Sequence, residues 1–239
     1  MYCEMYGQGE PLLLLHGFMG SGADWALVFK NPPDGFRSIF PDLRGHGRST
    51  NPSGVFTFRQ SARDVLALLD ALNVPRCKAI GVSGGAQTLL QMAVLQPDRI
   101  QAMVLVSGGH YFPKEARAFM RKFALENLPP AEQERMRQRH KQGEAQLQAL
   151  LQQAKGFQTS YDDMTLTPPH LSTITARTLL VFGDRDPLYP VQIPVEMHTS
   201  IPRSYLWMVP NGGHGPIFGD QSARFTETAL AFLGGAWDQ

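Results

Sequence analysis

Short, continuously apolar segments recur along the chain and alternate with longer segments that have helical periodicity. Continuous apolar runs are typical of strands that are covered on both faces. Strands that alternate with helices predict an α/β fold, with a mostly parallel central sheet and helices on both faces. The expected strands are Leu12–Leu15, Ser38–Phe40, Lys78–Val82, Ala102–Val106, Thr178–Phe182 and Tyr205–Val209.

Amphipathic helices are expected between these strands. A segment from Thr88 to Leu95 is expected to be helical and to end before Pro97, and Ser222–Leu233 is expected to form the last helix. The clearest pattern is a single apolar stripe at intervals of three and four residues, which predicts one face of an amphipathic helix. This stripe consists of Phe58, Ala62, Val65, Leu69 and Leu72.

The alternation stops between about residues 111 and 176, where no strong strand pattern is present. Pro129-Pro130 and Gly143 divide this polar stretch, which predicts two or three inserted helices. We therefore expect a catalytic core of residues 1–110 and 177–239 and a helical cap of residues 111–176. Within it, Lys114–Lys155 has nine Lys or Arg and five Asp or Glu residues. We interpret this charge as a solvated helix surface, with a site for anionic substrates as the alternative.

Length and charge exclude several classes of protein. The chain of 239 residues is long enough for one domain with an insertion, and its net charge of +1 gives no reason to expect nucleic acid as a partner. The run Leu12–Leu15 is too short to span a membrane, and the first residues lack the pattern of a secretory signal. We expect a cytoplasmic protein that acts on a small-molecule substrate, without membrane association; the oligomeric state stays open.

The pentapeptide Gly81-Val82-Ser83-Gly84-Gly85 joins an expected strand to an expected helix. A G-x-S-x-G sequence in this context is typical of a nucleophile elbow, a sharp turn that exposes one serine hydroxyl above a sheet. Glycines on either side of the turn let the strand and the helix approach each other closely. Ser83 is therefore the candidate nucleophile.

Acidic and basic partners for this serine follow further along the chain. Asp184 and Asp186 come directly after one expected strand, and His214 follows the next strand between glycines. Loops at the carboxyl ends of parallel strands meet at one edge of a sheet, so these side chains can converge on Ser83. His214 is the candidate base, since an imidazole can accept and return a proton near pH 7. The residues alone leave open whether Asp184 or Asp186 is the triad acid.

Several other residues that could carry chemistry are expected to have structural roles instead. Trp25 and Trp207 are expected in the core, and His140 is expected to be exposed on a helix. Asp42, Arg44 and Arg48 are expected to stabilise their loop through ion pairs, with ligand contact as the alternative. The sequence has no His-x-x-x-His pair, no paired cysteine motif and no glycine-rich phosphate or dinucleotide signature. We therefore expect neither a metal nor a cofactor.

Taken in order, these motifs resemble those of the alpha/beta-hydrolase superfamily, specifically its small capped serine hydrolases. The resemblance rests on His16-Gly17-Phe18, Pro41–Ser49, Gly81–Gly85, Gly183–Pro187 and Gly213-His214. It implies a catalytic triad of Ser83, His214 and Asp186. It further implies an oxyanion hole formed by the backbone N–H groups of Phe18 and Gly84.

The chain departs from the family pattern at two places. Only ten residues precede Pro11, so at most one strand, within Tyr2–Tyr6, replaces the usual N-terminal hairpin. Position 84 is glycine where many relatives have a larger residue, and we expect this to widen the space beside the nucleophile.

Hydrolysis of a carboxylic ester or a related acyl bond is the activity that the resemblance favours. Relatives with the same triad also cleave carbon–carbon bonds, thioesters, lactones or peptides, and these remain alternatives. A ligand receptor that retains the triad is the non-enzymatic alternative. Aromatic residues of the inserted region could line an apolar pocket or pack the cap against the core; they are Tyr111, Phe112, Phe119, Phe123 and Phe157.

Overall fold

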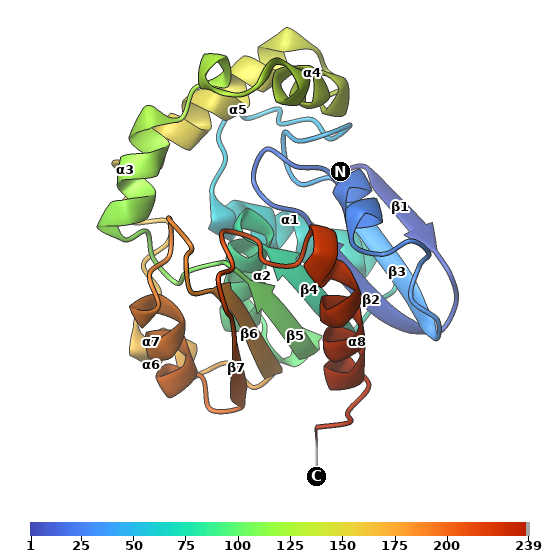
Figure 1. Ribbon diagram of the computed structural model, residues 1–239. Coiled ribbons are helices and arrows are strands. Elements are labelled where there is room, and N and C mark those ends of the chain that lie inside the picture. Colours follow the sequence, from blue (N-terminus) through green and yellow to red (C-terminus); the bar gives the residue numbers. More distant parts are fainter. Residues whose placement is uncertain (238–239) are drawn as a thin grey trace.

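The computed structural model describes residues 1–237, which contain one seven-stranded sheet with the order β1-β3-β2-β4-β5-β6-β7 (Figure 1). β1 is antiparallel to β3, and every other pair in the sheet is parallel. The strands are β1 (Cys3–Tyr6), β2 (Glu10–Leu15), β3 (Phe36–Pro41), β4 (Cys77–Val82), β5 (Ile100–Val106), β6 (Arg177–Gly183) and β7 (Ser204–Val209). All six strands expected from the apolar runs are confirmed, and β1 is the single N-terminal strand.

The register of the sheet aligns the carboxyl ends of its central strands. Leu15 of β2 lies opposite Gly81 of β4, which lies opposite Leu105 of β5. The row continues through Leu180 of β6 to Leu206 of β7. The loops that follow these strands therefore emerge along one edge of the sheet, although they are far apart in the sequence.

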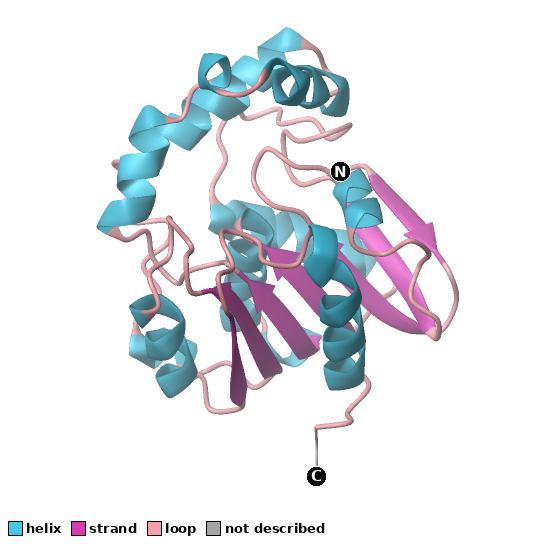
Figure 2. Ribbon diagram, in the orientation of Figure 1, coloured by secondary structure: helices cyan, strands magenta, loops and turns pink. Residues whose placement is uncertain are grey.

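Helices cover both faces of the sheet, as the strand pattern predicts (Figure 2). Along β2, Leu13 and Leu15 face one hydrophobic core, and Leu12 and Leu14 face the other. The leucine run is apolar throughout because both of its faces are buried. The first core is covered by α1 (Phe58–Ala71), α2 (Gly84–Leu95), α6 (Pro168–Leu171) and α7 (Gln192–Ser200), and the second by the 3-10 helix η1 (Gly22–Leu27) and α8 (Ser222–Leu233).

Residues 111–176, here called the helical insertion, connect β5 to β6, and their first three α-helices arch over the carboxyl edge of the sheet (Figure 1). The structure describes all of these residues, and they form α3 (Lys114–Lys122), α4 (Pro130–Arg139), α5 (Glu144–Gly156) and the four-residue α6. α4 begins at Pro130, and α5 begins after Gly143, which has a φ of 84°. The three longer helices and both breaks agree with the sequence prediction, whereas α6 was not expected.

The helices within residues 1–237 include none that is long and apolar enough to cross a membrane.

Candidate active site

Ser83 lies in a strained turn between β4 and α2. Its φ of 50° and ψ of −114° place a non-glycine residue in a region that L-amino acids rarely adopt. The turn is held by the Ser83 N–H, which donates to the Val106 carbonyl at 2.8 Å. A Cβ atom at Gly85 would lie 2.2 Å from the Leu15 carbonyl oxygen, so only glycine allows α2 to start this close to β2.

His214 lies within hydrogen-bond distance of Ser83. The His214 Nε2 atom is 2.9 Å from the Ser83 Oγ atom, and the histidine side chain is 26% exposed. The loop that carries it is anchored because the Gly215 N–H donates to the Ser107 hydroxyl at 3.0 Å. This geometry permits proton transfer between the hydroxyl and the imidazole.

Asp186 completes the contact on the other side of the imidazole. Its Oδ2 atom is 3.0 Å from His214 Nδ1, and its side chain is fully buried. The other carboxylate oxygen accepts hydrogen bonds from the N–H groups of Leu188 at 2.8 Å and Tyr189 at 3.2 Å. Asp184, by contrast, is exposed in the same turn. The structure therefore brings Ser83, His214 and Asp186 together and leaves Asp184 outside this group.

The backbone of Phe18 lies directly beside Gly84. A Cβ atom added at Gly84 would be 2.9 Å from the Phe18 nitrogen and 3.1 Å from its Cβ atom. The two N–H groups expected to bind an oxyanion thus belong to neighbouring segments next to Ser83. The expectation that Gly84 widens the site is wrong, because the Phe18 backbone occupies the space that a side chain at position 84 would need.

The Phe18 side chain packs against aromatic residues from separate parts of the chain. Its ring makes edge contacts with His46, Phe56 and Phe157, with centroids 4.7, 5.2 and 5.0 Å away. Phe157 belongs to the helical insertion and the other two belong to the core. The side chain therefore packs the loop against both parts, while the backbone faces Gly84.

Two cavities meet at Ser83 and His214. The first, here called the apolar chamber, has a volume of about 310 Å³. The second, here called the polar chamber because the charged residues Asp24, Glu132 and Arg139 are part of its lining, has a volume of about 260 Å³. Both are lined by Phe18, Met19, Ser83, Met136 and His214. Ser83 thus lies where the two cavities join.

A comparison with protein-family models matches residues 10–137 to the family described as the alpha/beta hydrolase fold. The chain belongs to this family. The match extends from the start of β2 into α4 and includes the turn at Ser83.

Individual relatives of this alpha/beta hydrolase carry several activity names. The protein named "Putative carbamate hydrolase RutD" from Variovorax paradoxus is 29% identical over 98% of this chain and 96% of its own. The 2-hydroxymuconate semialdehyde hydrolase of a Pseudomonas species is 28% identical over 95% of this chain and 88% of its own. Among solved structures, a thermophilic esterase from Thermogutta terrifontis is 26% identical with a TM-score of 0.77, covering 97% of this chain and 92% of the esterase.

The apolar chamber of this alpha/beta hydrolase is walled by the core and by the helical insertion together. Its lining from the insertion consists of Phe112, Phe119, Met120, Phe123, Met136, Ala154 and Phe157. Four of the five aromatic residues singled out in the sequence therefore line the chamber. The fifth, Tyr111, instead donates its hydroxyl to Glu196 at 3.3 Å.

Charged residues line the polar chamber. Arg139 Nε is 3.1 Å from Asp24 Oδ1, and Glu132, which also lines the chamber, is paired with Arg135. Sequence reasoning missed Asp24 and Arg139 because they lie in segments without a motif, more than a hundred residues apart. Trp25, expected in the core, is buried but also forms part of this wall.

Three buried histidines connect the loops above the sheet. His16 Nε2 accepts a hydrogen bond from the Leu43 N–H at 2.9 Å, and the rings of His16 and His46 are 5.3 Å apart. His140 Nδ1 accepts from the Gly47 N–H at 3.1 Å. The expectation that His140 is exposed is wrong, since this contact leaves it only 2% exposed. Burial lowers the pKa of His140 to about 4, and burial also lowers the pKa of His46.

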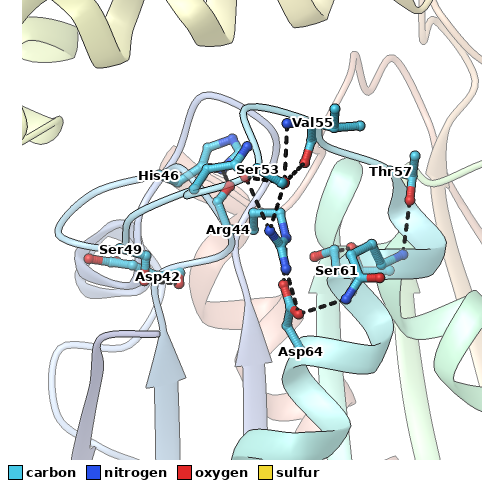
Figure 3. Close-up of polar contacts among 12 residues, drawn as sticks. Asp42, Arg44, His46, Ser49, Ser53, Val55, Thr57, Ser61 and Asp64 are labelled. Carbon is cyan, nitrogen blue, oxygen red and sulfur yellow. Dashed lines mark hydrogen bonds and ion pairs between the residues drawn. The ribbon is translucent and has the colours of Figure 1, made fainter.

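The loop at residues 41–49 is stabilised by ion pairs, as expected. Figure 3 shows Arg44 reaching Asp64 on α1, with its Nε and Nη2 atoms 2.6 and 2.8 Å from the two carboxylate oxygens. Arg48 pairs with Glu4 at 2.8 Å. Asp42 accepts hydrogen bonds from the N–H groups of Gly22 and Arg48 rather than pairing with an arginine side chain. The linings of the two chambers include none of Asp42, Arg44 and Arg48.

Residues 1–237 contain no group of three or more His, Cys, Asp or Glu residues placed to hold a metal ion. Cys3 and Cys77 are both free thiols.

Proposed function

We propose that this protein is a serine hydrolase that cleaves a carboxylic ester or a related acyl bond of a small substrate. The observation that carries the proposal is the continuous contact from Ser83 Oγ through His214 to the buried Asp186, at 2.9 and 3.0 Å. A serine hydroxyl is a weak nucleophile near neutral pH and requires an adjacent base. A carboxylate on the far nitrogen fixes the histidine tautomer and stabilises the imidazolium that forms.

The proposed reaction has two steps. Ser83 Oγ attacks the carbonyl carbon while His214 Nε2 accepts the hydroxyl proton, and the resulting oxyanion accepts hydrogen bonds from the N–H groups of Phe18 and Gly84. The carbon–oxygen bond to the leaving group then breaks, and the imidazolium donates its proton to the departing oxygen. In the second step His214 deprotonates a water that attacks the acyl-enzyme, which releases the acid and restores Ser83.

The chambers suggest how a substrate is oriented. The residues that line the apolar chamber include no Asp, Glu, Lys or Arg, and its one amide side chain, Gln87, donates to the Gly109 carbonyl at 3.4 Å. We propose that this chamber takes an uncharged apolar acyl group and that the leaving group occupies the polar chamber. The helical insertion would then act as a cap that selects the acyl group.

A panel of p-nitrophenyl esters with acyl groups of increasing length and with a benzoyl group tests this function. Wild-type protein should turn over medium-length or aromatic esters, and Ser83→Ala should reduce kcat by about 10⁴-fold or more. Ser172→Ala, at an exposed serine, serves as the control and should match wild type. Dialysis against EDTA should leave turnover unchanged. Full activity of Ser83→Ala would contradict the proposal.

Carbon–carbon bond hydrolysis is the second candidate. It is favoured by the 28% identity to 2-hydroxymuconate semialdehyde hydrolase over nearly the whole chain. A vinylogous diketone substrate and a simple aryl carbamate, assayed beside the esters, separate the candidates. Preference by more than a hundredfold in kcat/KM for the diketone would replace the ester proposal. Tight binding with negligible turnover of every substrate would instead favour a receptor.

A further inference from the structure

The loop that carries Phe18 is held in a conformation that the chain would not adopt by itself. Met19 has a φ of 67°, which is unusual for a residue other than glycine. Met19 lies within a tight turn, which is closed by a hydrogen bond from the Gly20 N–H to the Gly17 carbonyl at 2.9 Å. Such a conformation persists where surrounding contacts fix it.

The helical insertion supplies apolar contacts to this loop. The Met19 side chain is 6% exposed and belongs to a hydrophobic cluster whose other buried members all come from the insertion. Those members are Leu125, Met136, Leu147, Leu150 and Leu151. Met19 is thus packed as part of the insertion, although in sequence it belongs to the loop after β2.

Arg139, at the end of α4, fixes the same loop by polar contacts. Its Nη1 atom donates to the Met19 carbonyl at 3.3 Å, and its Nε atom donates to Asp24 Oδ1 at 3.1 Å. Asp24 in turn accepts from the Ser21 N–H at 3.0 Å through its other oxygen. The guanidinium therefore connects the loop at Met19 to η1 at Asp24, and the Arg139 side chain is 18% exposed.

On its other side the loop rests against the turn at Ser83. The Phe18 nitrogen lies 2.9 Å from the position of a Cβ atom at Gly84, so the loop is confined between the insertion and the turn. If the contacts between the insertion and the loop were lost, the Phe18 N–H could move relative to Ser83. Displacement of a reacting group by about 1 Å can reduce the rate by about 10²-fold.

We propose that Arg139 is a positioning residue that holds the Phe18 N–H where the oxyanion forms. This inference rests on the proposed function, because it assigns Arg139 an effect on the transition state of that reaction. Arg139 acts through the Met19 carbonyl of the loop and through Asp24 of η1, which accepts a hydrogen bond from Ser21 of the loop. The insertion thereby contributes to the reaction rate as well as to the wall of the substrate site.

Steady-state kinetics of Arg139→Met test the inference. The change should lower kcat by roughly 10- to 100-fold, with KM within about twofold of wild type, since the loss concerns the transition state alone. Arg139→Lys should recover part of kcat because an ammonium group can still donate to the Met19 carbonyl. Arg137→Met is the matched control on the same helix, where the arginine side chain is 44% exposed.

Arg139 also lines the polar chamber, so a direct contact with the leaving group must be distinguished. Wild type and Arg139→Met are compared on two esters that have the same acyl group and leaving groups of different size. If Arg139 acts through the loop, the substitution should lower kcat by the same factor for both esters. A trifluoromethyl ketone with that acyl group forms an oxyanion adduct with the serine. Its inhibition constant should rise in parallel with the loss of kcat/KM, whereas that of the product acid should stay constant.

The outcomes separate this inference from the proposed function. Wild-type turnover that depends on Ser83 supports the function by itself. An Arg139→Met variant with unchanged kcat, or with a loss found only in KM or only for one leaving group, overturns the inference and leaves the function intact. If Arg139→Met does not fold, Asp24→Asn and Arg139→Lys provide the test. In each variant, kcat and the affinity for the trifluoromethyl ketone should fall by the same factor.

Discussion

The ring of Tyr189 lies nearly parallel to that of His214, with centroids 5.9 Å apart and an angle of 29° between the planes. The Tyr189 N–H also donates to Asp186. Tyr189 therefore contacts His214 through its ring and Asp186 through its backbone. Burial is the main cause that raises the pKa of the Tyr189 hydroxyl, so the phenol is neutral at physiological pH. The Tyr189 ring therefore lies beside the imidazole without adding a charge there.

Removing this ring should affect both stability and catalysis. Tyr189→Ala should lower the free energy of unfolding by about 3–5 kcal/mol, the usual cost of truncating a buried aromatic residue. It should also lower kcat because the imidazole loses one of its supports. Tyr189→Phe retains the ring and should stay close to wild type in kcat. Urea unfolding and ester kinetics of both variants check this, and equal losses in kcat would show that the hydroxyl, rather than the ring, matters.

Substitution of the two aspartates in the turn after β6 should have very different effects. Asp186→Asn should reduce kcat by about 10⁴-fold, since an amide at this position favours the wrong histidine tautomer. Asp184→Asn should change kcat by less than about twofold because this side chain is exposed. The measurement is kcat on the best ester at pH 7. A crippled Asp184→Asn variant with an active Asp186→Asn variant would contradict the assignment.

Enlarging position 84 should harm the enzyme. The added methyl of Gly84→Ala would lie 2.9 Å from the Phe18 nitrogen, which is closer than real Cβ contacts allow. The Phe18 loop must then move away from Ser83, and kcat should fall by roughly 10-fold or more. Gly156→Ala, where a Cβ atom meets no neighbour, is the control and should be neutral or slightly stabilising. Unchanged kcat in Gly84→Ala would show that the loop adapts freely.

Acid should destabilise the fold through His140. Its pKa is about 4 in the folded protein, because of burial, against 6.5 for the free side chain. Between these values the unfolded chain binds more protons than the folded protein, so the free energy of unfolding falls as pH decreases from about 6.5 to 4. The contribution of His140 is on the order of 3 kcal/mol over this window.

His140→Gln should make this pH dependence shallower. The glutamine oxygen can still accept the Gly47 N–H, but the side chain does not titrate. Urea unfolding at several pH values between about 7 and 4.5 checks the slope for both proteins. His198→Gln, at an exposed histidine, should reproduce the wild-type slope. Equal slopes for wild type and His140→Gln would contradict the account.

Much of the fold could be predicted from the sequence because its strands are buried on both faces and read as continuous apolar runs. The turn at Ser83 was equally predictable, since glycines on both sides of one serine permit its geometry. The segment that contains His198 is helical, as expected, and forms α7, although Pro194 lies in its first turn. A proline in the first helical turn does not remove a hydrogen bond that the helix needs.

Residues whose position depends on distant partners could not be predicted from local pattern. His140 was expected on an exposed face, but the loop at Gly47 covers it. Asp24 and Arg139 were not recognised as part of the site because their contact depends on how the helical insertion folds over the core. The effect of Gly84 was misjudged for the same reason, since only the folded chain places Phe18 against it.

The most direct test of the account is to trap the acyl-enzyme on Ser83. Wild-type protein is mixed with a p-nitrophenyl ester, quenched with acid within the first turnovers, and digested for mass spectrometry. We expect an acyl group on the peptide that contains Ser83, and no such adduct in Ser83→Ala or, within the same time, in His214→Ala. An acyl group on a different residue, formed at the rate of turnover, would contradict it.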